Sequence, residues 1–293
     1  MQLKEYFSQK KKAIDFQLNQ YLPKEKSSKL VKAMRYSLFA GGKRFRPILV
    51  LATAELLGLP QKMVMPSACA IEMIHTFTLV HDDLPAMDND DFRRGKLTNH
   101  KVFGEDIAIL AGDALHILAF EVLVRFTPVK KPFTLNQVML ILCEALGKEG
   151  VVNGQVLDMQ AQAQSLGFKE LENIHQKKTG IFICACCKIP AVLACASAKQ
   201  LGALEKYSSH LGLAFQIADD ILDVEGNLEQ MGKSPGSDQQ NKKSTFVSLL
   251  GLQKAKRFAQ AEINKAKKSL KIFPKAKRKT LEEIADFTIS RSF

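Results

Sequence analysis

Residues 66–83 read PSACAIEMIHTFTLVHDD, an apolar segment that ends in two aspartates. At about 100° per residue, its polar groups gather on one side of a helix. This largely polar stripe consists of Glu72, His75, Thr76, Leu79, Asp82 and Asp83. A surface helix would have a wider polar face, and a helix with only a packing role would not end in two carboxylates. The segment therefore predicts a buried helix from Pro66 to Asp83 whose polar stripe faces a cavity.

Helical periodicity extends along the rest of the chain. Apolar residues recur at three- and four-residue spacing in segments 30–40, 107–125 and 252–270. Pro47 fits the first turn of a helix that stops at Gly58. Because we find no convincing strand, linker or solenoid repeat, we expect an all-α protein. Its 293 residues are expected to form a single domain, a helical bundle around a central substrate cavity.

The formal net charge of +12 suggests an anionic partner. Much of the excess lies in residues 10–12 and 265–279, where the lysines alternate with residues typical of a solvated helix face. Since no aromatic residues interleave with these charges, we expect no nucleic-acid partner.

The cysteines and the apolar segments favour an ordinary cytoplasmic protein. Cys184, Cys186 and Cys187 form no paired CxxC units, so we interpret them as small buried residues of a helix and not as a zinc site. Residues 181–196 are interrupted by Lys188 and a proline and are too short to span a bilayer. The charged amino terminus does not resemble a targeting segment.

A first aspartate cluster follows the helix of residues 66–83. Five carboxylates fall within residues 82–91, and Arg93 and Arg94 follow at once. Like charges at this spacing repel unless a cation or solvent screens them. An exposed acidic loop is one interpretation and a Mg²⁺ site is the other; delivery by a largely buried helix favours the Mg²⁺ site.

A second cluster, FQIADDILD at residues 215–223, repeats the arrangement. Gln216, Asp219, Asp220 and Asp223 stand at helical spacing on one face, while apolar residues cover the rest. Buried carboxylates need a cation to remain ionised, so metal ions or cationic ligands are the natural compensation.

The segment GGKRFRP at residues 41–47 places cations at the start of a helix, where backbone N–H groups also favour anions. It lacks the spacing of a Walker A loop and is not interpreted as an ATP site. Together with the two acidic clusters, it suggests metal ions held between aspartates and the phosphate oxygens of a ligand.

These motifs resemble the trans-isoprenyl diphosphate synthases, most of all those of the bacterial farnesyl diphosphate synthase type. The resemblance spans nearly the whole chain and rests on GGKRFRP, the DDxxxxD motif of Asp82 to Asp88 with its two arginines, Thr98-Asn99-His100, FGEDIAILAGDAL, Lys178-Thr179-Gly180, FQIADDILD, Gly232-Lys233 and Lys243-Ser244-Thr245. It implies a homodimeric prenyltransferase that joins isopentenyl diphosphate to dimethylallyl or geranyl diphosphate and gives farnesyl diphosphate.

The resemblance also implies the roles of individual residues. The catalytic residues are Asp82, Asp83, Asp88, Lys178, Asp219 and Asp220. Three Mg²⁺ ions would be held, with substrate bound, by Asp82, Asp88 and Asp219. The allylic diphosphate would contact Arg93, Lys178, Thr179, Gln216 and Lys233, and isopentenyl diphosphate would contact Lys43, Arg46, His75 and Arg94.

Product length is expected to depend on the helix that ends at Asp82. Phe77 lies five residues before this aspartate, about 7.5 Å back along the helix axis. The helical wheel places Thr78 more directly beneath Asp82, so spacing alone does not select Phe77. The resemblance does, because farnesyl synthases of the bacterial type carry an aromatic residue there together with the Pro85-Ala86 insertion.

Several positions depart from the pattern of the family, including Asn153 before Gly154 and Phe246 where tyrosine is frequent. None of them is a motif aspartate. A terpene cyclase is disfavoured because its second motif commonly carries Asn, Ser or Thr, and Glu. A non-catalytic synthase subunit would be free to lose an aspartate motif, and this chain keeps both. Synthesis of geranyl or geranylgeranyl diphosphate remains an alternative.

Overall fold

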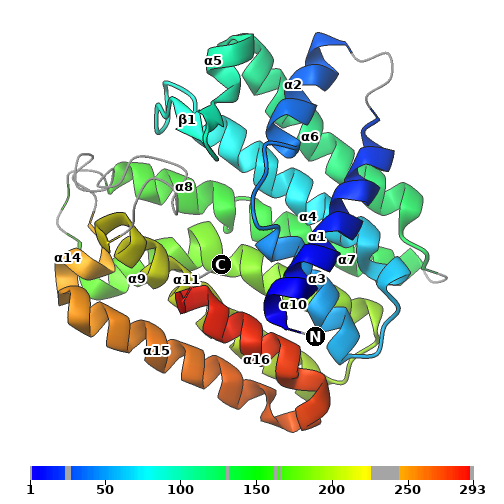
Figure 1. Cartoon of the computed structure of the whole chain (residues 1–293), viewed down its shortest axis with the longest axis vertical. Coiled ribbons are helices and arrows are strands. Elements are labelled where there is room, and N and C mark those ends of the chain that lie inside the picture. Colours follow the sequence, from blue (N-terminus) through cyan, green and yellow to red (C-terminus); the bar gives the residue numbers. More distant parts are fainter. Residues whose placement is uncertain are drawn as a thin grey trace. The chain divides into compact units, whose positions relative to one another are not determined.

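The computed structural model describes residues 2–23, 28–129, 132–161, 164, 166–225 and 244–290. Its backbone groups into two compact units (Figure 1). The first consists of Met1–Leu51 and Pro60–Leu135, and the second of Ala52–Leu59 and Asn136–Phe293. The single domain expected from the sequence remains a prediction. The all-α class is confirmed.

The first unit is built from helices and one short hairpin. In chain order its elements are α1 (Leu3–Tyr21), α2 (Lys29–Leu38), α4 (Gln61–Asp82), β1 (Phe92–Arg93), β2 (Lys96–Leu97), α5 (Asn99–Phe103) and α6 (Glu105–Phe126). Helices α3 (Phe45–Leu56) and α7 (Pro132–Leu146) cross the boundaries between the units. Within the first unit, α4 packs mainly on α6.

All the regular elements of the second unit, within its described residues, are helices. Its elements are α8 (Val151–Gln160), α9 (Phe168–His175), the π-helical turn η1 (Gln176–Gly180), α10 (Ile181–Leu193), α11 (Ala198–Glu225), α14 (Phe246–Leu250), α15 (Leu252–Ser269), the 3₁₀ turn η2 (Leu270–Ile272) and α16 (Lys275–Ser290). Figure 1 shows the long helix α11 beside α15 and α16, with which it packs. The cysteine interpretation is confirmed for Cys186 and Cys187, which are buried on α10, whereas Cys184 is half-buried.

Helix α4 begins earlier than the sequence pattern indicates. Pro60 is its N-cap, in an extended conformation, and Pro66 is its sixth residue. The prediction that Pro66 starts the helix is therefore wrong. A proline at this position removes one hydrogen bond, the one to the carbonyl of Lys62, and Lys62 is exposed, so solvent can replace the missing donor.

The expectation of no strand is wrong in one place. Phe92 pairs with Leu97 and Arg93 with Lys96 in an antiparallel hairpin. Its two turn residues, Arg94 and Gly95, have φ of 54° and 73°, as a tight two-residue hairpin turn requires. Because the strands are only two residues long, hydrophobic alternation could not reveal them.

Two helices of the first unit have the length and apolar composition of a membrane span. In α4, 72% of the apolar 18-residue stretch is buried inside the protein, which is typical of a core helix. In α6 only 39% is buried, and Ile109, Leu110, Ile117 and Val124 are exposed along it. Length and composition alone are weak evidence for membrane insertion.

Candidate active site

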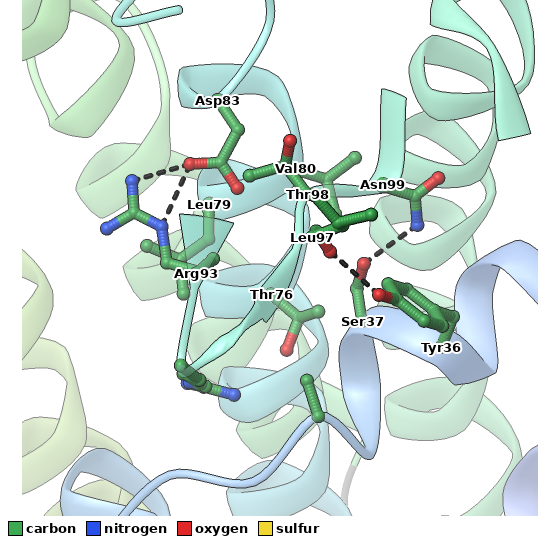
Figure 2. A pocket seen from close by; sticks show the side chains of 12 residues that line it. Tyr36, Ser37, Thr76, Leu79, Val80, Asp83, Arg93, Leu97, Thr98 and Asn99 are labelled. Carbon is green, nitrogen blue, oxygen red and sulfur yellow. Dashed lines mark hydrogen bonds and ion pairs between the residues drawn. The ribbon is translucent and has the colours of Figure 1, made fainter. Parts of the chain in front are cut away.

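The first aspartate pair lies where α4 ends, and its second member is bound by the hairpin. Asp83 is only 3% exposed, and its Oδ1 accepts hydrogen bonds from Arg93 Nε at 2.8 Å and Nη2 at 2.5 Å (Figure 2). Arg93 Nη2 also donates to Asp90 at 2.7 Å. Burial raises the pKa of Asp83 to about 6, although Arg93 opposes the shift. Arg93 thus compensates a carboxylate that burial would otherwise favour in its neutral form.

The turn after α4 brings the backbones of the two candidate metal ligands of this unit, Asp82 and Asp88, into contact. The backbone N–H of Asp88 donates to the carbonyl of Asp82 at 2.8 Å, and both residues are partly exposed. Leu84 anchors the turn in a small core with Val80 and Ala108. Among the described residues, no three Asp, Glu, His or Cys side chains already form a metal cluster. Two accessible carboxylates nevertheless fit Mg²⁺, which takes one or two protein carboxylates and completes its shell with water and phosphate oxygens.

A basic region surrounds His75, about two turns before Asp82 on α4. Arg46 Nη1 lies 3.4 Å from His75 Nε2. Burial and the neighbouring guanidinium groups, those of Arg46, Arg94, Arg93 and Arg44, hold the pKa of His75 well below its usual range. His75 is therefore neutral near pH 7 while arginines crowd around it, and such a region favours an anion that needs no metal. Lys43, three residues before Arg46 in the sequence, is exposed.

A small cavity lies between the hairpin, α2 and α4 (Figure 2). Its volume is about 20 Å³, enough for one water molecule and too small for a substrate. Its wall is tied together by hydrogen bonds from Tyr36 Oη to the carbonyl of Leu97 and from Asn99 Nδ2 to Ser37 Oγ, each 2.8 Å long. The first bond attaches the hairpin to α2, and the second attaches the start of α5 to α2, so the segment that follows Arg93 and Arg94 is fixed.

The candidate residues for product length lie on α4 opposite α6. The ring of Phe77 stacks on His116 of α6, with centroids 4.7 Å apart and planes 15° apart. His81 meets the same phenyl ring edge-on at 5.1 Å, and Phe120 contacts His116. The Thr78 hydroxyl donates to the backbone carbonyl of His75. His116 is not among the predicted site residues, although the four-residue spacing of Gly112, His116 and Phe120 could have indicated it.

The second aspartate pair lies on α11 in the second unit. Asp220 is 2% exposed, and its Oδ2 accepts a hydrogen bond of 2.7 Å from the backbone N–H of Phe246. Its Oδ1 accepts one from Gln216 Nε2 at 3.3 Å, and Gln216 Oε1 accepts one from Thr179 at 3.2 Å. Asp219 is partly exposed, while Asp223 is buried. Gln216 and Asp220 of the predicted face are thus joined to Thr179 in one hydrogen-bonded group.

Lys178 and Thr179 belong to η1, a π-helical turn of the kind that often occurs at functional sites. Lys178 Nζ donates to Asp158 Oδ2 of α8 at 2.7 Å. Gly154 allows α8 to approach, because a Cβ there would lie 2.3 Å from the backbone N of Lys178. Lys233, also predicted to contact the diphosphate, lies outside the described residues.

Comparison with known proteins agrees with these motifs. The polyprenyl synthetase family profile matches residues 27–284. This chain belongs to the polyprenyl synthetase family. A farnesyl diphosphate synthase of Geobacillus stearothermophilus is 46% identical over 92% of both chains. A chloroplastic geranylgeranyl pyrophosphate synthase of Capsicum annuum is 43% identical over 98% of this chain and 78% of its own length.

The fold agrees with a solved polyprenyl synthetase structure. An FPP/GFPP synthase from Zymomonas mobilis has a TM-score of 0.88 and 37% identity, and the match covers 98% of each chain. The chain is a short-chain trans-prenyl diphosphate synthase, a class that takes isopentenyl and allylic diphosphates and generally uses Mg²⁺. Since relatives named for different products are similar at nearly the same identity, identity does not decide the product length.

Proposed function

We propose that the chain condenses isopentenyl diphosphate with dimethylallyl and geranyl diphosphate, with farnesyl diphosphate as the final product. The observation that carries the choice of product is the stack of Phe77 on His116. An aromatic ring five residues before Asp82, backed by a second ring, would stop a growing prenyl chain. A smaller residue at position 77 would leave room for another isoprene unit.

We assign isopentenyl diphosphate to the basic region of the first unit. Lys43, Arg46, His75 and Arg94 would bind its diphosphate without metal. The support is the neutral His75 with the guanidinium groups of several arginines around it, an arrangement that favours an anionic ligand. Binding at this point would orient the double bond of the substrate toward the allylic carbon.

We assign the allylic diphosphate to the aspartate clusters. Asp82 and Asp88 in the first unit and Asp219 in the second would hold Mg²⁺, which stabilises the negative charge that develops on the departing diphosphate. Arg93, Lys178 and Lys233 would add positive charge, and Gln216 would add hydrogen bonds. Asp83 and Asp220 would act by holding Arg93 and Gln216 in place.

The remaining steps need few further groups. The carbonyl and hydroxyl dipoles of Lys178 and Thr179 would stabilise the allylic cation while an apolar pocket excludes water. The double bond of isopentenyl diphosphate attacks this cation, and the new carbon skeleton then loses a proton. Since no general base is evident in the motifs, the proton would go to the departed diphosphate.

We also propose a cytoplasmic homodimer. The exposed apolar residues of α6, Ile109, Leu110, Ile117 and Val124, form a patch that a second copy of this chain could cover. The molar mass in solution, measured by light scattering, would test this part of the proposal.

The product tests the function directly. The protein is incubated with isopentenyl diphosphate, dimethylallyl diphosphate and Mg²⁺, and the dephosphorylated products are separated by chromatography. Farnesol is expected. Geranylgeraniol or geraniol as the main product would contradict the chain length, and no condensation at all would indicate a non-catalytic subunit.

Phe77→Ala tests the role of the aromatic ring. It should shift the product from farnesyl toward geranylgeranyl diphosphate and lower stability by about 3 kcal/mol because it creates a cavity. Phe103→Ala, which removes another aromatic ring of the first unit, is the matched control and should still give farnesol. An unchanged farnesol peak from a folded, active Phe77→Ala enzyme would remove Phe77 as the length determinant.

A further inference from the structure

Glu72 is a buried carboxylate on α4 to which no role has been assigned above. It is 1% exposed, and its Oε1 accepts a hydrogen bond of 2.6 Å from Arg44 Nη1. Arg94 Nη2 approaches the same oxygen to 3.7 Å. A carboxylate this deeply buried is costly unless it is paired with cations, and both of these cations come from segments that belong to the basic region.

Arg44 links Glu72 to the loop that carries Lys43 and Arg46. Its Nε donates to Asp15 of α1 at 2.8 Å, and its Nη2 donates to the carbonyl of Leu38 at 2.6 Å. The residue is 3% exposed and has a φ of 54°, a conformation that a non-glycine residue adopts only when its surroundings fix it. Arg44, the residue after Lys43, therefore points into the protein and holds the loop in place.

Arg94 is attached to the same loop from the hairpin side. Its Nη1 donates to the carbonyl of Gly41 at 2.8 Å. At Gly42, where φ is 100°, a Cβ would lie 2.8 Å from Arg94 Cζ, so the loop backbone and the guanidinium are in close contact. Glu72 thus stands between the two arginines that fix the loop from opposite sides.

We propose that Glu72 is a positioning residue for the metal-independent anion site, holding Arg44 and Arg94 so that Lys43, Arg46 and Arg94 converge on one diphosphate group. This inference rests on the proposed function only in naming that anion as isopentenyl diphosphate. Glu72 itself, as a buried anion, would not contact the ligand.

Because Glu72 is charged, an electrostatic role and a positioning role predict different effects of its removal. If the carboxylate acted only through its charge, its removal would raise the positive potential at Arg94 and strengthen the binding of an anion. If it acts by positioning, its removal weakens the same binding. The two roles predict changes of opposite sign.

The test uses the full chain and inorganic diphosphate in EDTA, measured by calorimetry. Arg46→Ala should abolish the heat and so assign it to this site. Glu72→Gln should bind diphosphate about tenfold more weakly, because the charge-assisted hydrogen bond from Arg44 is weakened and the ion pair with Arg94 is lost. Equal or tighter binding would overturn the proposal.

Glu262→Gln is the matched control. Glu262 is a 2% exposed carboxylate on α15 in the second unit, paired with His210 at 2.6 Å and Lys265 at 2.7 Å. Its substitution disturbs a buried ion pair of the same kind without touching the anion site, so diphosphate binding should not change. A loss equal to that of Glu72→Gln would show a general effect of destabilisation and would also overturn the proposal.

A second variant covers the case in which Glu72→Gln does not fold. Asp15 is a third exposed and contacts Arg44 from the far side, so Asp15→Asn should fold and should weaken diphosphate binding by a smaller factor. Unchanged binding in Asp15→Asn would contradict the proposal.

Steady-state kinetics separate this inference from the function itself. In Glu72→Gln the KM for isopentenyl diphosphate should rise about tenfold, while the KM for the allylic substrate stays the same. An equal rise in both would contradict a role at one site. If the unaltered protein forms no prenyl product, the proposed function fails, and the binding series still decides whether Glu72 positions the anion site.

Discussion

The two aspartate pairs of the protein are alike in burial and different in what holds them. In each pair the first residue, Asp82 or Asp219, is partly exposed, and the second, Asp83 or Asp220, is buried. Asp83 is held by a guanidinium group, whereas Asp220 is held by the backbone N–H of Phe246 and by an amide. The accessible member of each pair is suited to a metal ion, and the buried member is suited to support the residues around it.

The groups that hold the two buried aspartates differ in charge. An arginine side chain places a full charge beside Asp83 and competes with the burial that raises the pKa of this carboxyl group. A backbone amide cannot be removed by a side-chain substitution, and it still donates a hydrogen bond, although a weaker one, when the charged acceptor is replaced by a neutral one. We therefore expect the first unit to be sensitive to changes of charge and the second to be sensitive to changes of backbone position.

The largest effect should come from the accessible aspartates. Asp82→Ala and Asp219→Ala should each lower turnover about 10³-fold or more, because the stabilisation of the departing diphosphate is lost. Neither change should destabilise the metal-free fold, since removing a carboxylate from an acidic cluster relieves repulsion. Thermal melts and turnover at saturating Mg²⁺ check this, and near-normal activity would contradict the metal-ligand assignment.

The buried aspartates should differ in stability. Asp83→Asn breaks a buried ion pair, and we expect a loss of roughly 3 kcal/mol in the free energy of unfolding. The loss should be no larger because Arg93 remains partly exposed to solvent. Asp220→Asn keeps an oxygen acceptor for the N–H of Phe246, so its loss should be about 1 kcal/mol.

Urea unfolding of the two asparagine variants provides the measurement. Equal losses would mean that the nature of the partner does not matter. A larger loss for Asp220→Asn would reverse the comparison.

The sequence predicted much of this arrangement and missed particular parts. The stripe on α4 and the face of α11 followed from helical spacing alone, because the side chains that share a face are fixed by the geometry of a single helix. The resemblance supplied the roles of Phe77 and Lys178. Contacts between elements distant in the chain, such as Arg44 with Glu72 and Phe77 with His116, have no local signal and required the structure.

The predicted start of α4 and the expectation of no strand were wrong for reasons that are local in the sequence. Pro66 looked like a helix start because proline is frequent there, but residues 61–65 continue the helix upstream, so the rule was applied one turn too late. The hairpin escaped notice because each strand has two residues and its turn uses Arg94 at positive φ, a position at which glycine or asparagine would have been the usual signal.

A pair of glycine substitutions tests backbone position in both units. In Gly154→Ala the new Cβ would lie 2.3 Å from the backbone N of Lys178, and the π turn cannot yield easily, so kcat should fall about tenfold or more. In Gly42→Ala the new Cβ would displace the Arg94 guanidinium, and the φ of 100° would strain the loop, so the main effect should be a several-fold higher KM for isopentenyl diphosphate. Steady-state kinetics with both substrates separate the two. A fall in kcat alone for Gly42→Ala would contradict the division of the sites.

The smallest effect concerns His75, and its sign follows from the lowered pKa. Unfolded His75 gains a proton as the pH falls through about 6.5, whereas the folded residue, surrounded by arginines, does not. The unfolded state then binds more protons, so the contribution of His75 to stability is present above that pH and declines below it. The stability difference between the unaltered protein and His75→Gln should therefore shrink by roughly 1 kcal/mol from pH 7.5 to pH 5.5 in urea unfolding. In an Arg46→Ala background the same difference should depend less on pH, because one of the charges that lowers the pKa is gone. A difference that stays constant with pH in both backgrounds would mean that His75 titrates as an ordinary histidine, and the basic region of the first unit would then lose its main electrostatic support.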